Sequence, residues 1–389
     1  MKYDVIVVGG GPGGSSAAIC LAEQGLRVLV LEEKRMPREK LCGEFITSEC
    51  LPTLSRLGVM DGVLAAGAER ITRLALNVSS GPPVSARLDE ISKSAGWALS
   101  LSRARFDQIL FDRARDAGAE CLERVAVREC SYDGATPDGV EAISLPAGRS
   151  LKFNAHFIVD ASGRNSRLTV NRTERVAGSR GSRLYAMKAH LSGVEGIEDQ
   201  VELHFFRQGY GGLSRVENGL VNLCFIAGER VVKEAGGAPL EVLRRTMMTS
   251  PLAGERLARA EVVGKWLTAG PLSFGKRRLS QSGVIAVGDA SGMIDPFTGT
   301  GIQIALRTGE LAADAIVRHI ANRGADGLVQ RVLASYAADY QAEFGNRIAV
   351  AGILRRVALT PGVANVAARI LALVPAFAVH LLRATRAGG

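Results

Sequence analysis

The chain has 389 residues, enough for one large domain or for two or three ordinary ones, and 47% of them are hydrophobic. Its formal net charge of +9 favours anionic partners such as a phosphate-bearing cofactor or an acidic membrane surface. The basic residues are scattered and aromatic residues make up only 5%, so the composition indicates no nucleic-acid-binding module.

The six cysteines and five histidines are dispersed along the chain and form no cluster with the spacing of metal ligands, so we expect no metal site. The sequence begins directly with an apolar run, which leaves no room for a signal peptide. We therefore expect a cytoplasmic protein with reduced thiols.

A glycine-rich turn lies between a predicted strand and a predicted helix at the N-terminus. The apolar run 5–8 predicts a buried parallel strand, and it leads into Gly9-x-Gly11-x-x-Gly14. Gly9 permits a tight turn, Gly11 lets a pyrophosphate approach the backbone, and Gly14 lets the helix pack on the strand. Free N–H groups at the helix N-terminus attract phosphate. The pattern predicts a dinucleotide-binding βαβ unit.

Glu32 stands at the end of a second predicted strand, 27–31, and follows Gly14 by 18 residues. A carboxylate there can accept hydrogen bonds from the hydroxyls of an unphosphorylated ribose, which favours FAD or NAD over NADP. The motif alone does not separate FAD from NAD. A glycine turn without a ligand is the alternative, and the ordered strand, turn, helix, strand and acid disfavour it.

The next segment contains Cys42-Gly43-Glu44, which follows a polar loop at 37–40 and precedes a helix predicted through 51–57. Cys42 beside basic residues fits a tuned, partly exposed thiol. It also fits a small buried hydrophobic residue, which composition alone favours. Residues 60–95 predict strands and loops.

A helix is predicted from residue 105 to Gly118, with apolar positions at helical spacing. Arg103, just ahead of it, is a candidate phosphate contact or a solvated surface arginine. Strands are predicted at 125–132, 142–145 and 154–159. The last of these leads into Asp160-Ala-Ser-Gly163, a nucleotide-proximal pattern or an ordinary turn.

Residues 175–265 predict a sheet-bearing second region, with strands at 183–192, 200–206, 219–227 and 262–266 and a helix at 240–249. The pair Gly211-Gly212 predicts a turn between two strands.

The chain then returns to the nucleotide domain through a predicted strand, 284–287, which Gly288-Asp289 follows. Asp289 can hold a ribityl hydroxyl. Gly299-x-Gly301 opens a long helix, whose free N–H groups can stabilise negative charge on a reduced flavin.

The sequence beyond about residue 330 is helical and apolar. Its last part, 363–389, contains Pro375 and is too interrupted for a membrane-spanning helix. A helix packed on the domain is favoured over an interfacial membrane helix or a lid on a lipophilic pocket.

Three stretches carry a family resemblance: the N-terminal glycine motif with Glu32, the Asp160–Gly163 turn, and the segment from Gly288 to Gly301. Together they resemble FAD-dependent oxidoreductases of the para-hydroxybenzoate hydroxylase class, in the branch of geranylgeranyl reductases and flavin-dependent halogenases. The resemblance covers residues 1 to about 330. It implies an α/β fold, with a Rossmann-like FAD-binding domain, an inserted α+β substrate domain with an antiparallel sheet, and a helical C-terminus.

The predicted domain boundaries follow from this resemblance. The FAD-binding domain takes 1–75, 101–174 and 271–330, the substrate domain takes 76–100 and 175–270, and the helical C-terminal region is 331–389.

The resemblance also implies the cofactor site. The ADP half would bind to the first glycine motif and to Glu32. Arg103 and Asp289 would hold the pyrophosphate and ribityl region. The isoalloxazine would lie near Gly299 to Gly301. The full set of implied FAD-binding residues is Gly9, Gly11, Pro12, Gly13, Gly14, Glu32, Glu33, Cys42, Gly43, Arg103, Val127, Asp160, Gly163, Gly288, Asp289, Pro296, Gly299, Thr300, Gly301 and Ile302.

The implied catalytic residues are Cys42, Glu44 and Tyr210. The Cys-Gly-Glu segment matches one that lies beside the flavin in geranylgeranyl reductases. Tyr210-Gly-Gly-Leu-Ser-Arg215 stands where those reductases carry a YxWxFP motif facing the lipid, and it keeps only the tyrosine. The related WxWxIP motif of halogenases is absent as well, which disfavours halogenation.

Two chemistries remain open, and both fit a lipophilic substrate and a possible peripheral membrane contact through the C-terminal region. In the first, reduced FAD delivers hydride to an isoprenoid-type double bond while Glu44 or Cys42 supplies the proton. In the second, reduced FAD activates oxygen to hydroxylate or epoxidise a phenolic, polyketide or isoprenoid substrate. No second GxGxxG is present, so NAD(P)H or another reductant would act as a transient donor. A non-enzymatic flavoprotein is a third hypothesis.

Overall fold

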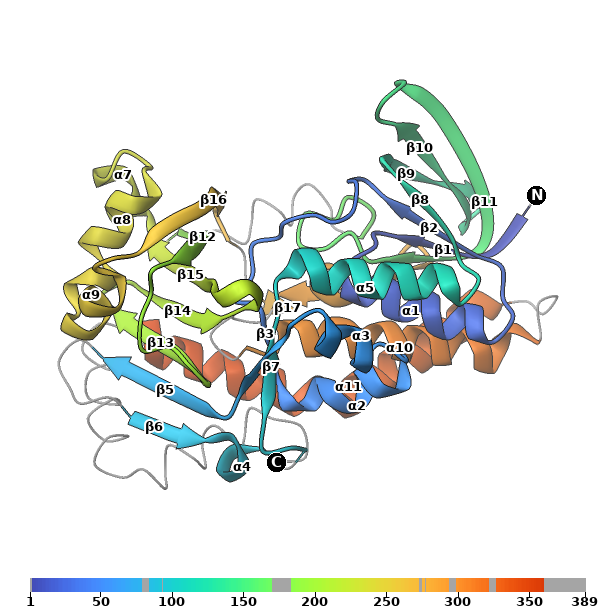
Figure 1. Ribbon diagram of the computed structural model, residues 1–389. Coiled ribbons are helices and arrows are strands. Elements are labelled where there is room, and N and C mark those ends of the chain that lie inside the picture. The colour runs from blue at the N-terminus through green and yellow to red at the C-terminus, as the bar shows by residue number, and fades with distance from the viewer. Residues whose placement is uncertain are drawn as a thin grey trace.

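The computed structural model describes residues 2–78, 84–92, 94–169, 183–272, 275–276, 278–293, 299–321 and 327–359, and it describes only the backbone of residues 78, 275–276, 293 and 346–359. Two large sheets, each covered by helices, lie side by side (Figure 1). The α/β fold class that the sequence predicts is thus confirmed. Residues 363–389 and Pro296 lie outside the described residues.

The first sheet has eight strands around a parallel centre. Its main path runs in the order β18 (Ser280–Gln281), β19 (Val284–Ala286), β11 (Arg149–Asp160), β1 (Lys2–Val8), β2 (Val28–Glu32) and β8 (Glu120–Glu123). The antiparallel strands β9 (Val125–Asp133) and β10 (Thr136–Ser144) extend from β11. The central strand β1 is apolar and fully covered at residues 5–8, as a parallel strand between two layers must be.

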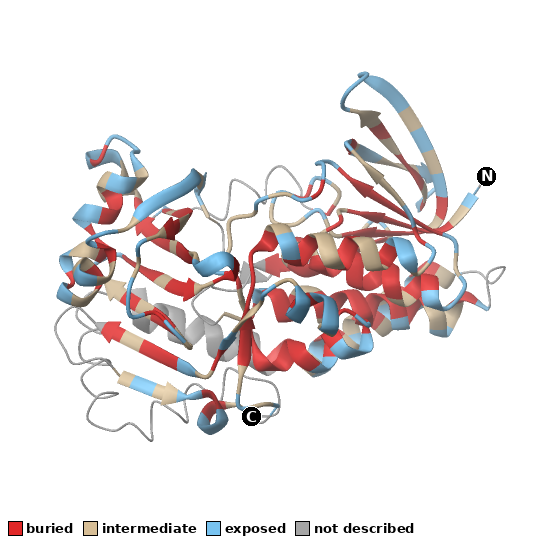
Figure 2. Cartoon of the chain, viewed as in Figure 1, coloured by how far each residue is buried: buried red, intermediate tan, exposed pale blue. Residues whose placement is uncertain are grey.

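Three helices cover one face of this sheet: α1 (Pro12–Glu23), α5 (Arg103–Asp116) and α10 (Gly301–Ile320) (Figure 1). Helices α1 and α10 pack very closely, because a Cβ added to Gly309 would lie 2.3 Å from the carbonyl oxygen of Gly13. Figure 2 shows that these helices and the strands above them form the most buried part of the molecule. This core holds the glycine turn rigidly at the carboxyl end of β1.

The second sheet has seven strands in the order β16 (Glu261–Ala269), β12 (Leu184–Ser192), β15 (Val221–Gly228), β14 (Gly209–Arg215), β13 (Gln200–Phe206), β5 (Arg73–Val78) and β6 (Val84–Arg87). One of its faces packs on α7 (Glu229–Glu234), α8 (Pro239–Arg245) and α9 (Pro251–Leu257). The opposite face looks toward the first domain.

Shorter elements join the two sheets. They are the three-stranded sheet β3 (Phe45–Ile46), β7 (Ala98–Ser100) and β4 (Glu69–Ile71), the pair β17 (Gly275–Lys276) and β20 (Gly292–Met293), and the helices α2 (Leu51–Arg56), α3 (Met60–Ala65) and α4 (Leu88–Ile91). Helix α11 (Leu328–Leu359) follows α10 and packs against it. Within the described part of the chain, no helix is both long and apolar enough to cross a membrane.

Two expectations about local structure were wrong. Residues 60–65 and 88–91 form helices α3 and α4 rather than strands or loops. The pair Gly211-Gly212 lies inside strand β14, and the turn occurs earlier, at Gln208, where φ is +63°. Glycine is needed at 211 for space rather than for turning, because a Cβ there would lie 2.6 Å from Met247 Sδ.

Candidate active site

The glycine turn has the close contacts that its spacing predicts. Gly9 has a φ of +107°, and a Cβ on Gly14 would lie 1.9 Å from the carbonyl oxygen of Gly9, so helix α1 begins directly against the turn. At Gly11, the helix N-cap, an added Cβ would meet only the guanidinium groups of Arg38 at 3.5 Å and Arg103 at 4.0 Å. Gly14 therefore serves packing, and Gly11 leaves a space bordered by positive charge.

Glu32 lies at the carboxyl end of β2 and is 5% exposed. Its carboxylate accepts hydrogen bonds from the backbone N–H of Gly10 at 2.8 Å and of Lys34 at 2.9 Å. These contacts fix the carboxylate beside the glycine turn, the place from which it can reach a ribose. Glu33, its neighbour, is exposed.

Arg103 and Arg38 share one carboxylate. Arg103 makes two hydrogen bonds to Asp107, at 2.6 and 2.8 Å, and Arg38 Nη1 lies 2.9 Å from the same carboxylate. Burial disfavours the charge of Arg103, yet Asp107 and the Cys42 sulfur raise its pKa. Arg103 is thus a buried, fixed cation and not a solvated surface residue.

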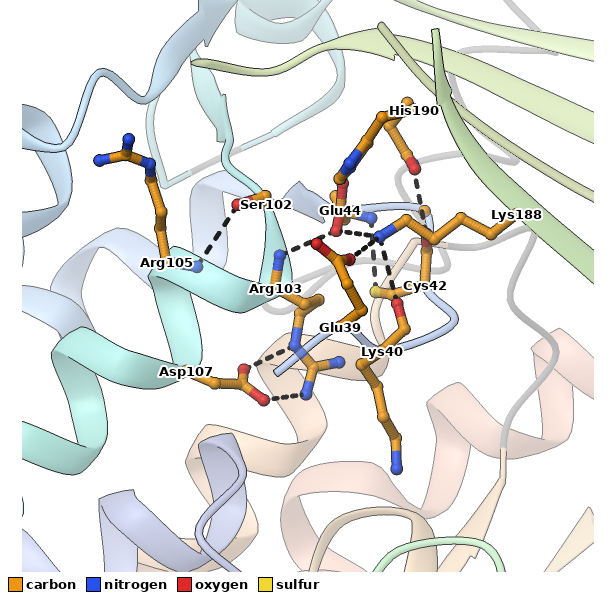
Figure 3. Close-up of polar contacts among 12 residues, drawn as sticks. Glu39, Lys40, Cys42, Glu44, Ser102, Arg103, Arg105, Asp107, Lys188 and His190 are labelled. Atoms are coloured by element: carbon orange, nitrogen blue, oxygen red, sulfur yellow. Dashed lines mark hydrogen bonds and ion pairs between the residues drawn. The ribbon is translucent and has the colours of Figure 1, made fainter. Parts of the chain in front are cut away.

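Lys40 adds a third cation to this place. Its Nζ lies 3.8 Å from the Cβ position of Gly163, in the loop that follows β11. Burial lowers the pKa of Lys40, and repulsion from Arg38 and Arg103 lowers it further, while Asp289 acts in the opposite sense. No ion pair is drawn from Lys40 Nζ to the other residues shown in Figure 3.

Three cations thus lie near the N-terminus of α1, where Asp107 pairs with Arg38 and Arg103 and the Glu32 carboxylate lies 3.4 Å from Arg38. A pyrophosphate would be attracted by these cations and would meet free backbone N–H groups at the helix N-terminus. The residues present therefore fit the ADP half of FAD. Val127, on β9, packs against the cluster that contains Leu31, whose side chain points to the face of β2 opposite to Glu32.

Asp160 and Gly163 form the neighbouring loop. The Asp160 carboxylate is fully buried and accepts hydrogen bonds from the hydroxyls of Ser162, Ser166 and Thr169. It therefore holds the loop in shape, while Gly163, with a φ of +82°, brings the backbone up to Lys40.

The predicted flavin end lies at the N-terminus of α10. Gly288 donates its N–H to the Thr308 hydroxyl at 2.9 Å, which fixes the turn that carries Asp289. Thr300 caps the helix, and a Cβ on Gly301 would have nothing within 4 Å. A Cβ on Gly299 would lie 3.0 Å from the ring of Phe45, so this turn approaches the strand that follows Glu44. Pro12, Gly13 and Ile302 are buried in the helices behind.

Glu44 is the centre of a charged cluster (Figure 3). Its fully buried carboxylate accepts hydrogen bonds from Lys188 Nζ at 2.5 Å and from the backbone N–H of Arg103 at 2.8 Å, and lies 2.6 Å from His190 Nε2. Lys188 also contacts Glu39 at 3.0 Å. Both Glu44 oxygens are engaged, so this side chain holds the loop, and its part in catalysis stays a prediction.

Glu39, Glu44 and His190 bring potential metal-ligating atoms within 4.8 Å of one another. The Lys188 ammonium already contacts both carboxylates, so a cation of the protein occupies the space between them. His190 borders two cavities, of about 510 and about 310 Å³, that lie on either side of Glu39. The cluster thus lies between solvent-accessible space and the loop.

Cys42 lies on this loop and is half-buried. Its Sγ accepts a hydrogen bond from the backbone N–H of Glu44 at 3.3 Å and lies beside the Arg103 guanidinium. Gly43 is exposed and a Cβ there would have nothing within 4 Å. The loop therefore presents a thiol and open space next to the cation-lined cradle.

Tyr210, on β14, is 6% exposed and lies in an apolar cluster on the face of the second sheet that also carries Lys188. The cluster contains Leu184, Ala186, Tyr210 and Ile226, with Leu41, Phe205 and Leu272 packed against it. Leu41 directly precedes Cys42, so the structure brings this apolar wall next to the thiol.

The sequence analysis missed five residues of the site: Arg38, Lys40, Asp107, Lys188 and His190. Lys188 and His190 are two residues apart in a predicted strand, and this spacing puts both side chains on one face of the sheet. The basic loop at 37–40 was noted, but only the fold shows that it reaches the glycine turn.

Comparison with known proteins agrees with this geometry. A family model described as "FAD binding domain" matches residues 2–339. The chain is 28% identical to digeranylgeranylglycerophospholipid reductase 2 of Methanopyrus kandleri, with 89% of this chain and 84% of that protein covered. It is 25% identical to tryptophan 2-halogenase of Chondromyces crocatus, with 82% of this chain but only 61% of that protein covered.

The fold is also similar to solved structures. That of the myxobacterial chondrochloren halogenase, described as an FAD-dependent halogenase, superimposes with a TM-score of 0.76 and 25% identity. The match covers 90% of this chain and 82% of that one.

Proposed function

The chain belongs to the FAD-binding-domain family of FAD-dependent oxidoreductases, and from this premise we propose that it reduces a carbon–carbon double bond in a lipophilic, isoprenoid-type substrate. One observation carries the proposal. The loop of Cys42 places a half-buried cysteine between the cation-lined cradle for the cofactor and the apolar wall that contains Tyr210. Reduction of an alkene needs such a combination: a hydride source, a proton source and an apolar surface.

The bound FAD would supply the hydride. Cys42 would supply the proton from its Sγ, and the Glu44 N–H and the Arg103 guanidinium would then stabilise the negative charge left on sulfur. Glu44 would act through its contacts with Lys188 and His190, by holding the backbone of the loop.

The apolar wall would bind the substrate. Tyr210, Ile226 and Ala186 lie on the sheet face toward the loop, and removal of an alkyl chain from water onto them is favourable by about 25 cal/mol per Å². The segment 210–215 lacks the larger aromatic residues expected of archaeal geranylgeranyl reductases. We therefore propose an isoprenoid chain without specifying its length.

The relatives include both reductases and halogenases. The reductase from Methanopyrus kandleri is matched over 84% of its length and the chondrochloren halogenase over 82% of its own, so the choice of reduction rests on the site. The electron donor in this proposal is NAD(P)H or a protein reductant. A peripheral membrane contact would bring a membrane-borne lipid to the site.

The test is a single anaerobic turnover. The FAD-loaded protein is reduced chemically, mixed with a geranylgeranyl lipid, and followed by the visible absorbance of oxidised flavin. We expect reoxidation together with a product that has gained two hydrogens, both of which are deuterium when reduction and mixing are carried out in heavy water. Cys42→Ala should slow this reoxidation, whereas Cys130→Ala, which changes a cysteine on β9, should not.

Other outcomes would select another reaction. A hydroxylated or epoxidised product that forms only with oxygen would replace the proposal with a monooxygenase. A brominated product that forms with oxygen and bromide would replace it with a halogenase. Absence of all three reactions, with the flavin reduced and bound, would contradict enzymatic turnover of this substrate class.

A further inference from the structure

Cys224 lies beneath the loop that carries Cys42. Asn222 and Cys224 are two residues apart on β15, so their side chains point to the same face of the sheet. Asn222 Nδ2 donates a hydrogen bond to the carbonyl oxygen of Cys42 at 3.2 Å. The cross-strand partner of Cys224 is Lys188, which donates to the carbonyl oxygen of Lys40 at 3.3 Å. Cys224 is therefore flanked by two side chains that hold the loop backbone on either side of residue 41.

The two thiols have different surroundings. Both residues are half-buried, but the Cys42 sulfur has the Glu44 N–H and the Arg103 guanidinium beside it as hydrogen-bond donors, an environment that favours a reactive sulfur. Burial raises the pKa of Cys224 to about 12, and the nearby Cys42 raises it as well. An oxidant that enters the site would thus react first with Cys42, and Cys224 would be the second thiol.

We propose that Cys42 and Cys224 form a peroxide-sensitive pair, in which oxidation closes a disulfide between the loop and strand β15. Hydrogen peroxide would oxidise Cys42 to a sulfenic acid and release one water. The Cys224 sulfur would then attack the Cys42 sulfur, and the sulfenic oxygen would leave as a second water. The two thiols lose two electrons and two protons, and the peroxide O–O bond is reduced to two waters.

This pair would couple the redox state of the loop to the flavin. Reduced FAD that reacts with oxygen in place of substrate releases hydrogen peroxide, and Cys42 is a thiol beside the cofactor cradle. The disulfide would remove Cys42 as a proton donor and bind the loop to the sheet, so uncoupled turnover would switch the enzyme off until a thiol reductant restores it. That consequence rests on the proposed function. The disulfide itself does not.

The experiment is peptide mapping of the FAD-loaded full chain after treatment with hydrogen peroxide, without reduction of disulfides. Cleavage after Lys and Arg and after Glu separates Cys42 from Cys50, because Glu44 and Glu49 lie between them. We expect one linked peptide pair that contains Cys42 and Cys224, and we expect it to disappear on treatment with a thiol reductant.

Two variants make the result decisive. Cys224→Ala should abolish the linked peptide and lead Cys42 on to the irreversible sulfinic acid, whereas Cys130→Ala should leave the linked pair unchanged. Formation of sulfinic acid at Cys42 in the unaltered chain, with no linked peptide, would overturn the proposal. So would a peptide that links Cys42 to a cysteine other than Cys224. Because mapping needs no substrate, either result stands whether or not the protein reduces an alkene.

Discussion

The ammonium of Lys188 lies 2.5 Å from Glu44 Oε1, and the two side chains are 1% and 0% exposed. The residues are 144 positions apart in the sequence and belong to the two different sheet-bearing regions. Glu44 has a φ of +57°, a conformation that a glutamate adopts only under constraint. The ion pair therefore fixes the position of the Cys42 loop relative to the second sheet.

Lys188→Met should lower the free energy of unfolding by about 3–5 kcal/mol, because it leaves the Glu44 carboxylate buried without its cation. Urea unfolding at neutral pH measures this loss. The double variant Lys188→Met/Glu44→Gln should recover part of it, since neither charge then remains. A single variant within about 0.5 kcal/mol of the unaltered protein would show that the pair does not hold the loop.

Gly11→Ala and Gly14→Ala should separate cofactor binding from folding. The Gly11 Cβ meets no protein atom closer than 3.5 Å, so this variant should fold normally but bind FAD at least about tenfold more weakly, because the methyl group occupies the space for the pyrophosphate. The Gly14 Cβ would lie 1.9 Å from Gly9 O, so that variant should be unstable even without FAD. Thermal unfolding of the apo-proteins and FAD titration give both values. A Gly11→Ala protein with unchanged FAD affinity would place the pyrophosphate elsewhere.

Lys40→Met should stabilise the apo-protein and weaken FAD binding. Burial and repulsion from Arg38 and Arg103 lower the pKa of Lys40 in the folded apo-protein. Between that lowered pKa and 10.5, the unfolded chain therefore binds more protons at Lys40 than the folded chain does. The stability of the apo-protein should therefore rise with pH across this window, and Lys40→Met should remove that rise.

The same linkage predicts proton uptake when FAD binds. The pyrophosphate raises the pKa of Lys40 again, so calorimetric titration in the alkaline range should give heats that depend on the ionisation enthalpy of the buffer. Lys40→Met should abolish this dependence. Equal heats in two buffers for the unaltered protein would mean that Lys40 does not contact the pyrophosphate.

The local parts of the site could be predicted from the sequence, and the long-range parts could not. The roles of Gly9 and Gly14 follow from backbone geometry within one βαβ unit, and the structure has that geometry. The contact of Lys188 with Glu44 depends on how two sheets face each other, which no periodicity within a strand encodes. Gly211 is a case in which a local pattern gave the wrong prediction, because glycine there makes room for Met247 and does not turn the chain.

Glu202 should make the second domain sensitive to acid. Its carboxylate is 2% exposed, lies 3.0 Å from His204 Nε2, and pairs with Arg256 at 3.1 Å. Burial favours the neutral acid, but His204 and Arg256 outweigh it and lower the pKa of Glu202 below 4.5. A lowered carboxyl pKa contributes stability above pH 4.5 that is lost as the pH falls through the folded-state value. Glu202→Gln should thus be destabilising at neutral pH by about 3 kcal/mol, and the difference should shrink as the pH falls below 4.5.

The control is Glu195→Gln, because the Glu195 side chain is 80% exposed and pairs with Arg259 at the surface. Urea unfolding at both pH values should not distinguish this variant from the unaltered protein. A Glu202→Gln deficit that stays constant with pH would show that packing, and not the charge of Glu202, stabilises this part of the sheet.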